Sequence, residues 1–261
     1  MASLLRKLFR RRKQPPLVCA ISLDDHGNPL GDDPNHVHTS ACFIDFEPLA
    51  VVELFQSQGC VSCPPAIPGI QDGAAHPNLL FLTYDVTLFD HLGWKDTFAQ
   101  TAWDNRQRAY IRKWNRTSIF TPQIVVNGVT DGSGATGKAE VQDIVNRFRD
   151  MQRAMDWHIY LDVNDTDVLI DSDRLELEPH DILLVLYNAR DEVVKIGKGP
   201  NKGKKVKHRN VVTNIIKIGQ WTGGNLMVPL PSPKSSMEPG QDAAILVQQG
   251  PGGAIVAVGK V

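Results

Sequence analysis

Long apolar runs alternate with helical periodicity between residues 49 and 155. Buried strands are predicted over residues 49–55, 78–86 and 123–128. Helices are predicted around 67–71, over 97–114 and over 138–155, the last with Val141, Ile144, Val145, Phe148 and Met155 on one face. Strands alternating with helices are typical of an α/β domain, which we therefore place at residues 49–155.

The pattern changes near residue 156, where short β-rich segments replace the helices. Turn residues separate these segments roughly every 8 to 12 residues, which is typical of a β-sandwich. The predicted strands cover residues 157–163, 168–170, 174–177, 182–187, 193–196, 211–218, 226–230, 243–248 and 254–258. We therefore expect an all-β, sandwich-like C-terminal domain over residues 156–261, with a domain boundary near 156.

Residues 1–48 lack such periodicity and are predicted to be an irregular extension with turn clusters. The extension begins with a basic tail in which Leu4, Leu5, Leu8 and Phe9 would give a short helix an apolar side. Three interpretations remain: a solvated tail, which we favour, a transit peptide or membrane-surface helix, and a secretory signal. The apolar stretch over 17–23 is short for a secretory signal and is interrupted by Ser22. We expect an intracellular, cytoplasmic protein, with mitochondrial targeting by the basic N-terminus as the alternative and membrane-surface contact by residues 4–13 disfavoured.

Overall charge adds little, because 28 Lys and Arg nearly balance 29 Asp and Glu and leave a net charge of -1. Such a balance points to no nucleic-acid partner. No apolar run approaches the roughly 18 residues of a transmembrane helix. His26, His36 and His38 lie among turn residues, where a solvated loop is favoured over a metal site.

Cys60 and Cys63 carry the candidate chemistry. They follow a predicted strand and Gly59, and we expect Cys60 to open a helix whose free N–H groups and dipole stabilise a thiolate. Cys63 would lie one turn further on, where it can attack a mixed disulfide formed at Cys60. Cys19 and Cys42 have no partner spacing and are expected to be buried or free thiols.

Redox chemistry is favoured over the two other uses of such a pair. Zinc normally takes four ligands, and no second CxxC or CxxH pair is present. An inert structural pair is the other alternative. Thr121 and Pro122 immediately precede the predicted strand over 123–128. We predict a cis Thr121–Pro122 bond beside the cysteines, as in a thioredoxin-type loop that receives an extended substrate.

Several motifs in the same order resemble the DUF1223 family of thioredoxin-like proteins. They are Val51–Ala66, Leu92–Asp96, Arg106–Tyr110, Phe120–Gly128 and, in outline, His208–Val212. The resemblance runs from about residue 48 to the C-terminus. It implies a thioredoxin-like domain followed by a β-rich domain and implies no particular reaction.

Further residues are candidates around the dithiol. Gln58, Trp94, Arg106 and Tyr110 are predicted, with Thr121 and Pro122, to bind substrate, although core packing is an equal alternative for the two aromatic residues. Glu53, on a buried strand, is a possible proton acceptor; an ion pair with Arg106 or Arg108 is favoured instead. The basic segment 195–209 is expected to be a solvated loop, or else to reach the dithiol and lower a thiol pKa.

The sequence therefore predicts a thiol–disulfide oxidoreductase or redox-responsive protein, with Cys60 as nucleophile and Cys63 as resolving thiol. A non-catalytic interaction module and a Cu(I)- or Zn-handling protein are the alternatives. No cofactor is required, and the expected partner is a dithiol or disulfide protein or a small thiol.

Overall fold

The computed structural model describes residues 47–155, 157, 159–175 and 177–261. Predictions for the basic tail, for the histidines at positions 26, 36 and 38, and for Cys19 and Cys42 lie outside these residues. Pro48–Val261 forms one compact unit. None of the described helices is long and apolar enough to cross a membrane.

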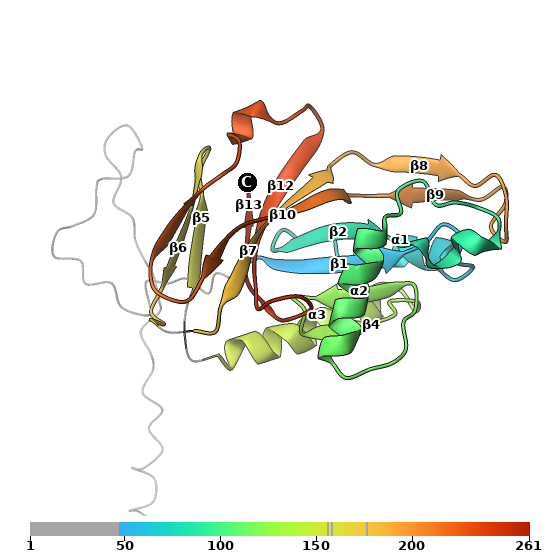
Figure 1. The fold of residues 1–261 in the computed structure, drawn as a ribbon. Helices are drawn as coiled ribbons and strands as arrows, with labels where there is room; N and C mark the ends of the chain where they lie inside the picture. Colours follow the sequence, from blue (N-terminus) through green and yellow to red (C-terminus); the bar gives the residue numbers. More distant parts are fainter. Residues whose placement is uncertain (1–46, 156, 158, 176) are drawn as a thin grey trace, which may run out of the picture. The chain divides into compact units, whose positions relative to one another are not determined.

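A mixed eight-stranded sheet forms the centre of this unit (Figure 1). Its strands run in the order β13 (Ile255–Lys260), β12 (Gln241–Gln248), β7 (His180–Asn188), β10 (Val211–Trp221), β2 (Leu79–Asp85), β1 (Ala50–Gln56), β3 (Gln123–Val126) and β4 (Thr130–Gly132). Strands β1 and β2 are parallel and pair from Ala50 and Leu79 to Gln56 and Asp85. Their carboxyl ends therefore meet at the same edge, where the cysteines follow β1.

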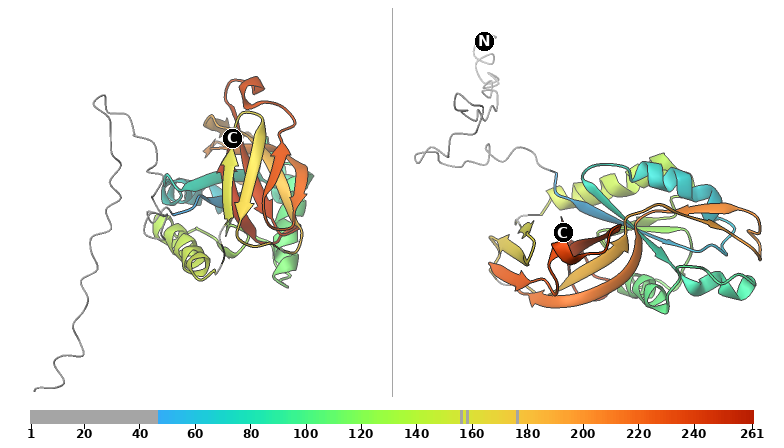
Figure 2. Two further views of the ribbon diagram at one scale, coloured as in Figure 1. Left: turned by 90° about the vertical axis from the view of Figure 1, so that its left-hand side faces the viewer. Right: turned by 90° about the horizontal axis from the view of Figure 1, so that it is seen from above.

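Helices cover both faces of the α/β half of the sheet (Figure 2). Helices α1 (Cys63–Gly73) and α3 (Lys138–Arg153) pack on one face, where Ile70, Val141 and Ile144 meet the even-numbered residues of β1. Helix α2 (Thr101–Lys113) packs on the other face, where Trp103 and Tyr110 join the odd-numbered residues. Because side chains of a strand alternate between faces, β1 is buried on both sides.

The predicted domain boundary near residue 156 is wrong, because the central sheet continues across it. Strand β10 pairs in parallel with β2 at Val211 and Thr83. The side chain of Asn210 strengthens this junction by donating from Nδ2 to the carbonyl of Phe81 at 2.7 Å. One apolar core also combines Val51 and Tyr84 with Val185 and Leu246. The two halves therefore share a sheet and a core.

The C-terminal half is rich in β-strands, as expected. A three-stranded antiparallel sheet of β11 (Leu226–Pro229), β6 (Asp167–Ser172) and β5 (Ile159–Val163) packs against the central sheet. Val168 and Ile170 meet Ile182 and Ile245 in that interface. The strand predicted at 174–177 is wrong, because residues 174, 175 and 177 are irregular.

A two-stranded ribbon, β8 (Glu192–Lys195) with β9 (Lys205–His208), extends from the central sheet (Figure 1). Its loop and β9 lie in the basic segment 195–209. The short helix η2 (Thr87–Leu92) follows β2, and a short helix η3 (Lys234–Ser236) precedes β12. Both the ribbon and η2 lie beside the segment that carries the cysteines.

Candidate dithiol site

The cysteines lie where the chain turns from β1 into α1. Helix α1 begins at Cys63 with Ser62 as its N-cap, and the following prolines occupy its first turn as predicted. Cys60 precedes the helix rather than opening it. It lies in a turn in which its N–H donates to Ser57 and its carbonyl accepts from Cys63 at 3.4 Å. The turn still brings the Cys60 sulfur to the N–H groups of Ser62 and Cys63.

Gly59 permits this turn to lie against η2. A Cβ atom at position 59 would come within 2.8 Å of Phe89 Cβ and 2.9 Å of the Phe89 carbonyl oxygen. Contacts that short do not occur between real side chains and backbone, so only glycine fits. The residue before Cys60 is therefore fixed as glycine by the close approach of η2.

Thr121, which immediately precedes Pro122, lies beside both thiols. Their peptide bond is cis, as predicted. The Cys60 Sγ lies 3.4 Å from the Thr121 carbonyl oxygen. On the other side of this loop, Gln107 in α2 donates from Nε2 to the carbonyl of Phe120 at 2.8 Å and to Gln123 Oε1 at 2.8 Å. Helix α2 thus holds the cis-proline loop in place.

The two thiols differ in acidity. The pKa of Cys60 is lowered to about 5, chiefly by a hydrogen bond from the Cys63 side chain. Burial opposes this effect. Hydrogen bonds from the Thr121 side chain and from the N–H groups of Ser62 and Cys63 lower the pKa further. Burial raises the pKa of Cys63 well above its ordinary value, and the charge of Cys60 raises it further. Both residues are buried, at 4% and 1% exposed, and Cys60 is the more exposed of the two. At neutral pH Cys60 is therefore the thiolate and Cys63 the thiol.

The β8–β9 ribbon covers the dithiol. Ile196 and Val206 from the ribbon form one apolar cluster with Cys60, Cys63 and Ile67. The basic segment 195–209 thus reaches the dithiol, the second of its two predicted behaviours. Its lysines are not what lowers the Cys60 pKa, which is due to the short-range hydrogen bonds above.

Gln58 connects the cysteine turn to a buried polar cluster. Its Oε1 accepts from Trp94 Nε1 at 2.8 Å, and its backbone N–H donates to Asp96 Oδ2 at 2.6 Å. Its Nε2 lies 3.2 Å from His208 Nε2. Gln58 and Trp94, predicted to bind substrate, therefore bind each other and brace the turn.

The polar cluster consists of Asp85, Asp96 and His208, all buried. The Nδ1 of His208 lies 3.2 Å from Asp85 Oδ1. Burial raises the pKa of Asp96 to about 7, and the charge of Asp85 adds to the rise. Burial lowers the pKa of His208, but the hydrogen bond and charge of Asp85 outweigh this effect and leave it above its ordinary value. The cluster therefore holds protons near neutral pH.

Glu53, Arg106 and Tyr110 form a separate buried cluster. Arg106 Nε lies 2.7 Å from Glu53 Oε1, and Tyr110 donates to the other carboxylate oxygen. Gln248 from β12 completes it by accepting from Arg106 Nη1 at 3.1 Å. The ion pair with Arg106 that was favoured for Glu53 is present. Tyr110 is fully buried and cannot line an open groove, so its predicted substrate contact is wrong.

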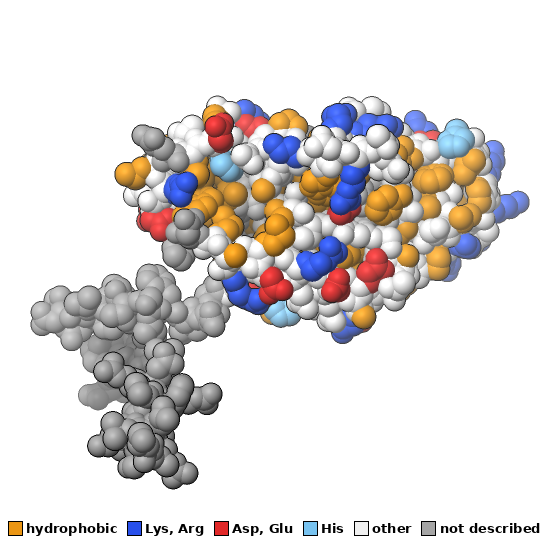
Figure 3. All heavy atoms as spheres, turned by 90° about the horizontal axis from the view of Figure 1, so that it is seen from below, with side chains coloured by type: hydrophobic (Ala, Val, Ile, Leu, Met, Phe, Trp, Pro, Cys, Tyr) orange, Lys and Arg blue, Asp and Glu red, His pale blue; other side chains and the backbone are white. Residues whose placement is uncertain are grey.

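Exposed apolar side chains surround the turn and the cis-proline loop. Val61 is 59% exposed beside Cys60, Phe120 is exposed beside Thr121, and Leu92 ends η2. On the face of the molecule drawn in Figure 3, apolar side chains lie in patches among Lys, Arg, Asp and Glu. Val61 and Phe120 therefore offer apolar contacts next to the turn and the loop.

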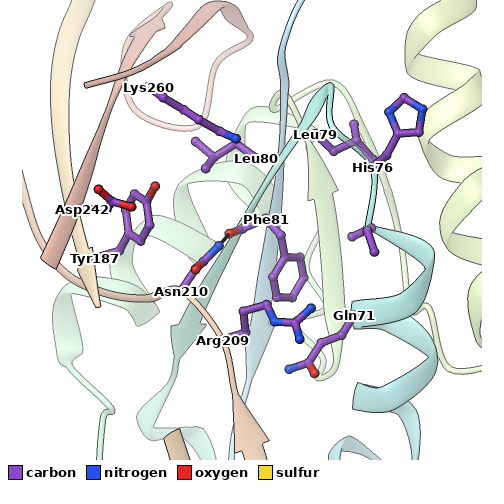
Figure 4. A pocket seen from close by; sticks show the side chains of 12 residues that line it. Gln71, His76, Leu79, Leu80, Phe81, Tyr187, Arg209, Asn210, Asp242 and Lys260 are labelled. Atoms are coloured by element: carbon purple, nitrogen blue, oxygen red, sulfur yellow. Dashed lines mark hydrogen bonds between the residues drawn. The ribbon is translucent and has the colours of Figure 1, made fainter. Parts of the chain in front are cut away.

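A pocket of about 290 Å³ lies elsewhere, where β2 and β10 diverge (Figure 4). Arg209, Asn210 and Lys260 are among the residues that line it, and neither cysteine does. Within the described residues, no group of three or more His, Cys, Asp and Glu side chains is placed to hold a metal ion.

The sequence pattern does not identify four residues of the site: Asp85, Asp96, Asn201 and His208. Asp85 carried a signal, because it ends an apolar strand parallel to the one that precedes the cysteines. Asn201 and His208 lie about 140 to 150 positions beyond the residues they contact. Both fall in the basic segment 195–209, and His208 begins one of the family motifs, but neither signal gives the residue a role in the site.

Comparisons with known proteins agree with the sequence motifs. The model of the family described as "Protein of unknown function (DUF1223)" matches residues 51–248. A crystal structure of protein AGR_C_4864 from Agrobacterium tumefaciens is similar at 27% identity and a TM-score of 0.64, covering 82% of this chain and 95% of that one. HBP35 of Porphyromonas gingivalis matches at 11% identity and a TM-score of 0.48, covering 83% of this chain and 75% of that one. A search of curated proteins found no match.

Proposed function

Since the chain belongs to the DUF1223 family of unknown function, we propose from its site that it is a thiol–disulfide oxidoreductase with a thioredoxin-type arrangement. The observation that carries the proposal is the inequality of the two cysteines. A thiolate with a pKa of about 5 at Cys60 lies next to a protonated thiol at Cys63, and both lie beside a cis-proline loop. Nucleophile and resolving thiol in dithiol exchange need this difference.

The reaction proceeds in two exchanges. The Cys60 thiolate attacks one sulfur of a substrate disulfide, forms a mixed disulfide and releases the other substrate sulfur as a thiolate. Cys63 then gives up its proton, to the departing thiolate or to water, and attacks Cys60 Sγ. A Cys60–Cys63 disulfide forms and the second substrate thiolate leaves. Two electrons pass from the protein dithiol to the substrate, and an external dithiol returns them.

Substrate would meet the protein at the cis-proline loop and the apolar side chains beside it. The Thr121 carbonyl already lies next to the Cys60 sulfur, so a chain bonded to that sulfur runs past the loop. Exposed Val61 and Phe120 favour an apolar polypeptide flank over a small polar thiol. The protein dithiol carries the electrons itself, so the reaction requires no organic cofactor.

A mixed-disulfide experiment tests the proposal. In a background with Cys19→Ser and Cys42→Ser, oxidised glutathione is added to the otherwise wild-type chain and to its Cys63→Ser and Cys60→Ser variants. The products are weighed by intact-mass spectrometry. The wild type should end as an internal disulfide without bound glutathione, and Cys63→Ser as a stable glutathione adduct at Cys60. Cys60→Ser should gain no adduct at Cys63. Equal reaction of both variants would contradict the assigned roles.

A further inference from the structure

A buried side chain of the β8–β9 ribbon binds the backbone on both sides of Gly59. Asn201 is fully buried in a loop whose neighbours Lys202 and Gly203 are exposed. Its Nδ2 donates to the carbonyl of Gln58 at 2.8 Å and to that of Cys60 at 2.7 Å. The two donors of this amide are therefore both used on the cysteine turn.

The orientation of the Asn201 amide is itself fixed. Lys204 Nζ donates to Asn201 Oδ1 at 2.9 Å. A lysine can donate only to the oxygen of the amide, so the nitrogen must face the cysteine turn. The arrangement thus runs from an exposed lysine through a buried amide to the peptide that carries the nucleophile.

This contact matters for the chemistry because the pKa of Cys60 depends on the direction in which its side chain leaves the backbone. The hydrogen bonds that stabilise its thiolate come from Cys63, Thr121 and the N–H groups at the start of α1. Each needs the Cys60 side chain to leave the backbone at one angle, and the Gln58–Cys60 turn sets that angle. Among the contacts that hold this turn, Gly59 against η2 and Gln58 against Asp96 act before Cys60. Asn201 contacts the carbonyl of Cys60 itself from the β8–β9 ribbon.

We propose that Asn201 is a positioning residue of the dithiol, through which the β8–β9 ribbon sets the reactivity of Cys60. The inference rests on the proposed function, since it concerns the nucleophile of that reaction. On the cysteine turn Asn201 contacts backbone carbonyls only, and it takes no part in bond making.

The test compares the pH profile of Cys60 alkylation by iodoacetamide in the full chain and in Asn201→Leu. Leucine has nearly the shape of asparagine and makes no hydrogen bond. If Asn201 only filled space, the profile would not move. We expect its midpoint to rise by about one pH unit, a tenfold change in the thiolate-to-thiol ratio. An unchanged midpoint in a folded variant, checked by circular dichroism, would overturn the proposal.

If Asn201→Leu does not fold, two milder variants test whether Asn201 positions Cys60. Lys204→Met and Lys202→Met each remove one exposed positive charge of the same loop, and only Lys204 bonds to Asn201. Lys204→Met should raise the midpoint more than Lys202→Met. Equal midpoints would overturn the proposal.

The glutathione experiment and the alkylation profiles together separate the role of Asn201 from the proposed function. A wild-type chain that forms no Cys60–Cys63 disulfide with oxidised glutathione contradicts the proposed function. A wild type that forms it, together with unchanged profiles in the variants above, contradicts the role of Asn201 alone.

Discussion

The sulfur of Cys60 lies 3.4 Å from the carbonyl oxygen of Thr121, 61 positions further along the chain. This contact brings the CxxC turn and the cis-proline loop into one site. It leaves the Cys60 sulfur at the meeting point of β1, α1 and the loop before β3, the place where an incoming disulfide would be attacked.

Cys60 should therefore be the first thiol to react with an alkylating reagent. In a background with Cys19→Ser and Cys42→Ser, the rate of iodoacetamide modification should rise with a midpoint near pH 5. Cys63 should stay unmodified below pH 9, because burial holds its proton. The rate is followed by mass spectrometry of peptides. Faster modification of Cys63 would reverse the assigned roles.

Asp96 should make stability fall as pH rises. Its pKa is about 7 in the folded protein against 3.8 in the unfolded chain, so between these values the folded protein holds a proton that the unfolded chain has lost. Stability then declines with rising pH, and the raised pKa of His208 acts in the same direction. Cys60 has a lowered pKa and acts in the opposite direction.

The Asp96→Asn variant isolates the contribution of Asp96. Urea unfolding at pH 5 and pH 8 is compared with the wild type, so that contributions common to both proteins cancel. The wild type should lose on the order of 2–4 kcal/mol relative to the variant between these two pH values. Parallel pH dependence of the two proteins would mean that Asp96 is ionised throughout.

Glu53→Gln should destabilise the protein without changing the dithiol. The substitution leaves the Arg106 guanidinium buried without its carboxylate, which costs about 3–5 kcal/mol in comparable buried pairs. The midpoint of Cys60 alkylation should stay near pH 5, because none of the interactions that lower its pKa involves Glu53. A chemical-unfolding curve and the alkylation profile measure the two effects. A shifted alkylation midpoint at normal stability would instead restore Glu53 as a proton acceptor.

The sequence predicts those parts of the site whose geometry depends on residues close together in the chain or on adjacent elements. The CxxC after a buried strand, the cis Thr121–Pro122 bond and the Glu53–Arg106 pair each follow from residues whose surroundings are set by neighbouring elements. The start of the helix was placed three residues too early, because the turn at Cys60 depends on how closely Gly59 approaches Phe89.

The features that the sequence does not predict depend on contacts between residues far apart in the chain. Apolar periodicity predicts that β10 is a strand but does not predict that Val211 pairs with Thr83. The pattern alone therefore indicates two domains where the structure has one sheet. Asn201 lies among lysines and glycines that predict a solvated loop. Only the folded ribbon reveals that its amide is turned inward to the cysteine turn.

An equilibrium redox titration of the Cys60–Cys63 pair tests whether this dithiol exchanges reversibly with disulfides. The chain with Cys19→Ser and Cys42→Ser is equilibrated in glutathione buffers of graded potential, starting from both the reduced and the oxidised protein. The thiols that remain are then counted by alkylation and mass. We expect one reversible two-electron transition between dithiol and disulfide, with a midpoint between about -120 and -270 mV. Curves from the two starting points that fail to meet, or a dithiol that stays reduced across the whole range, would contradict a thiol–disulfide oxidoreductase.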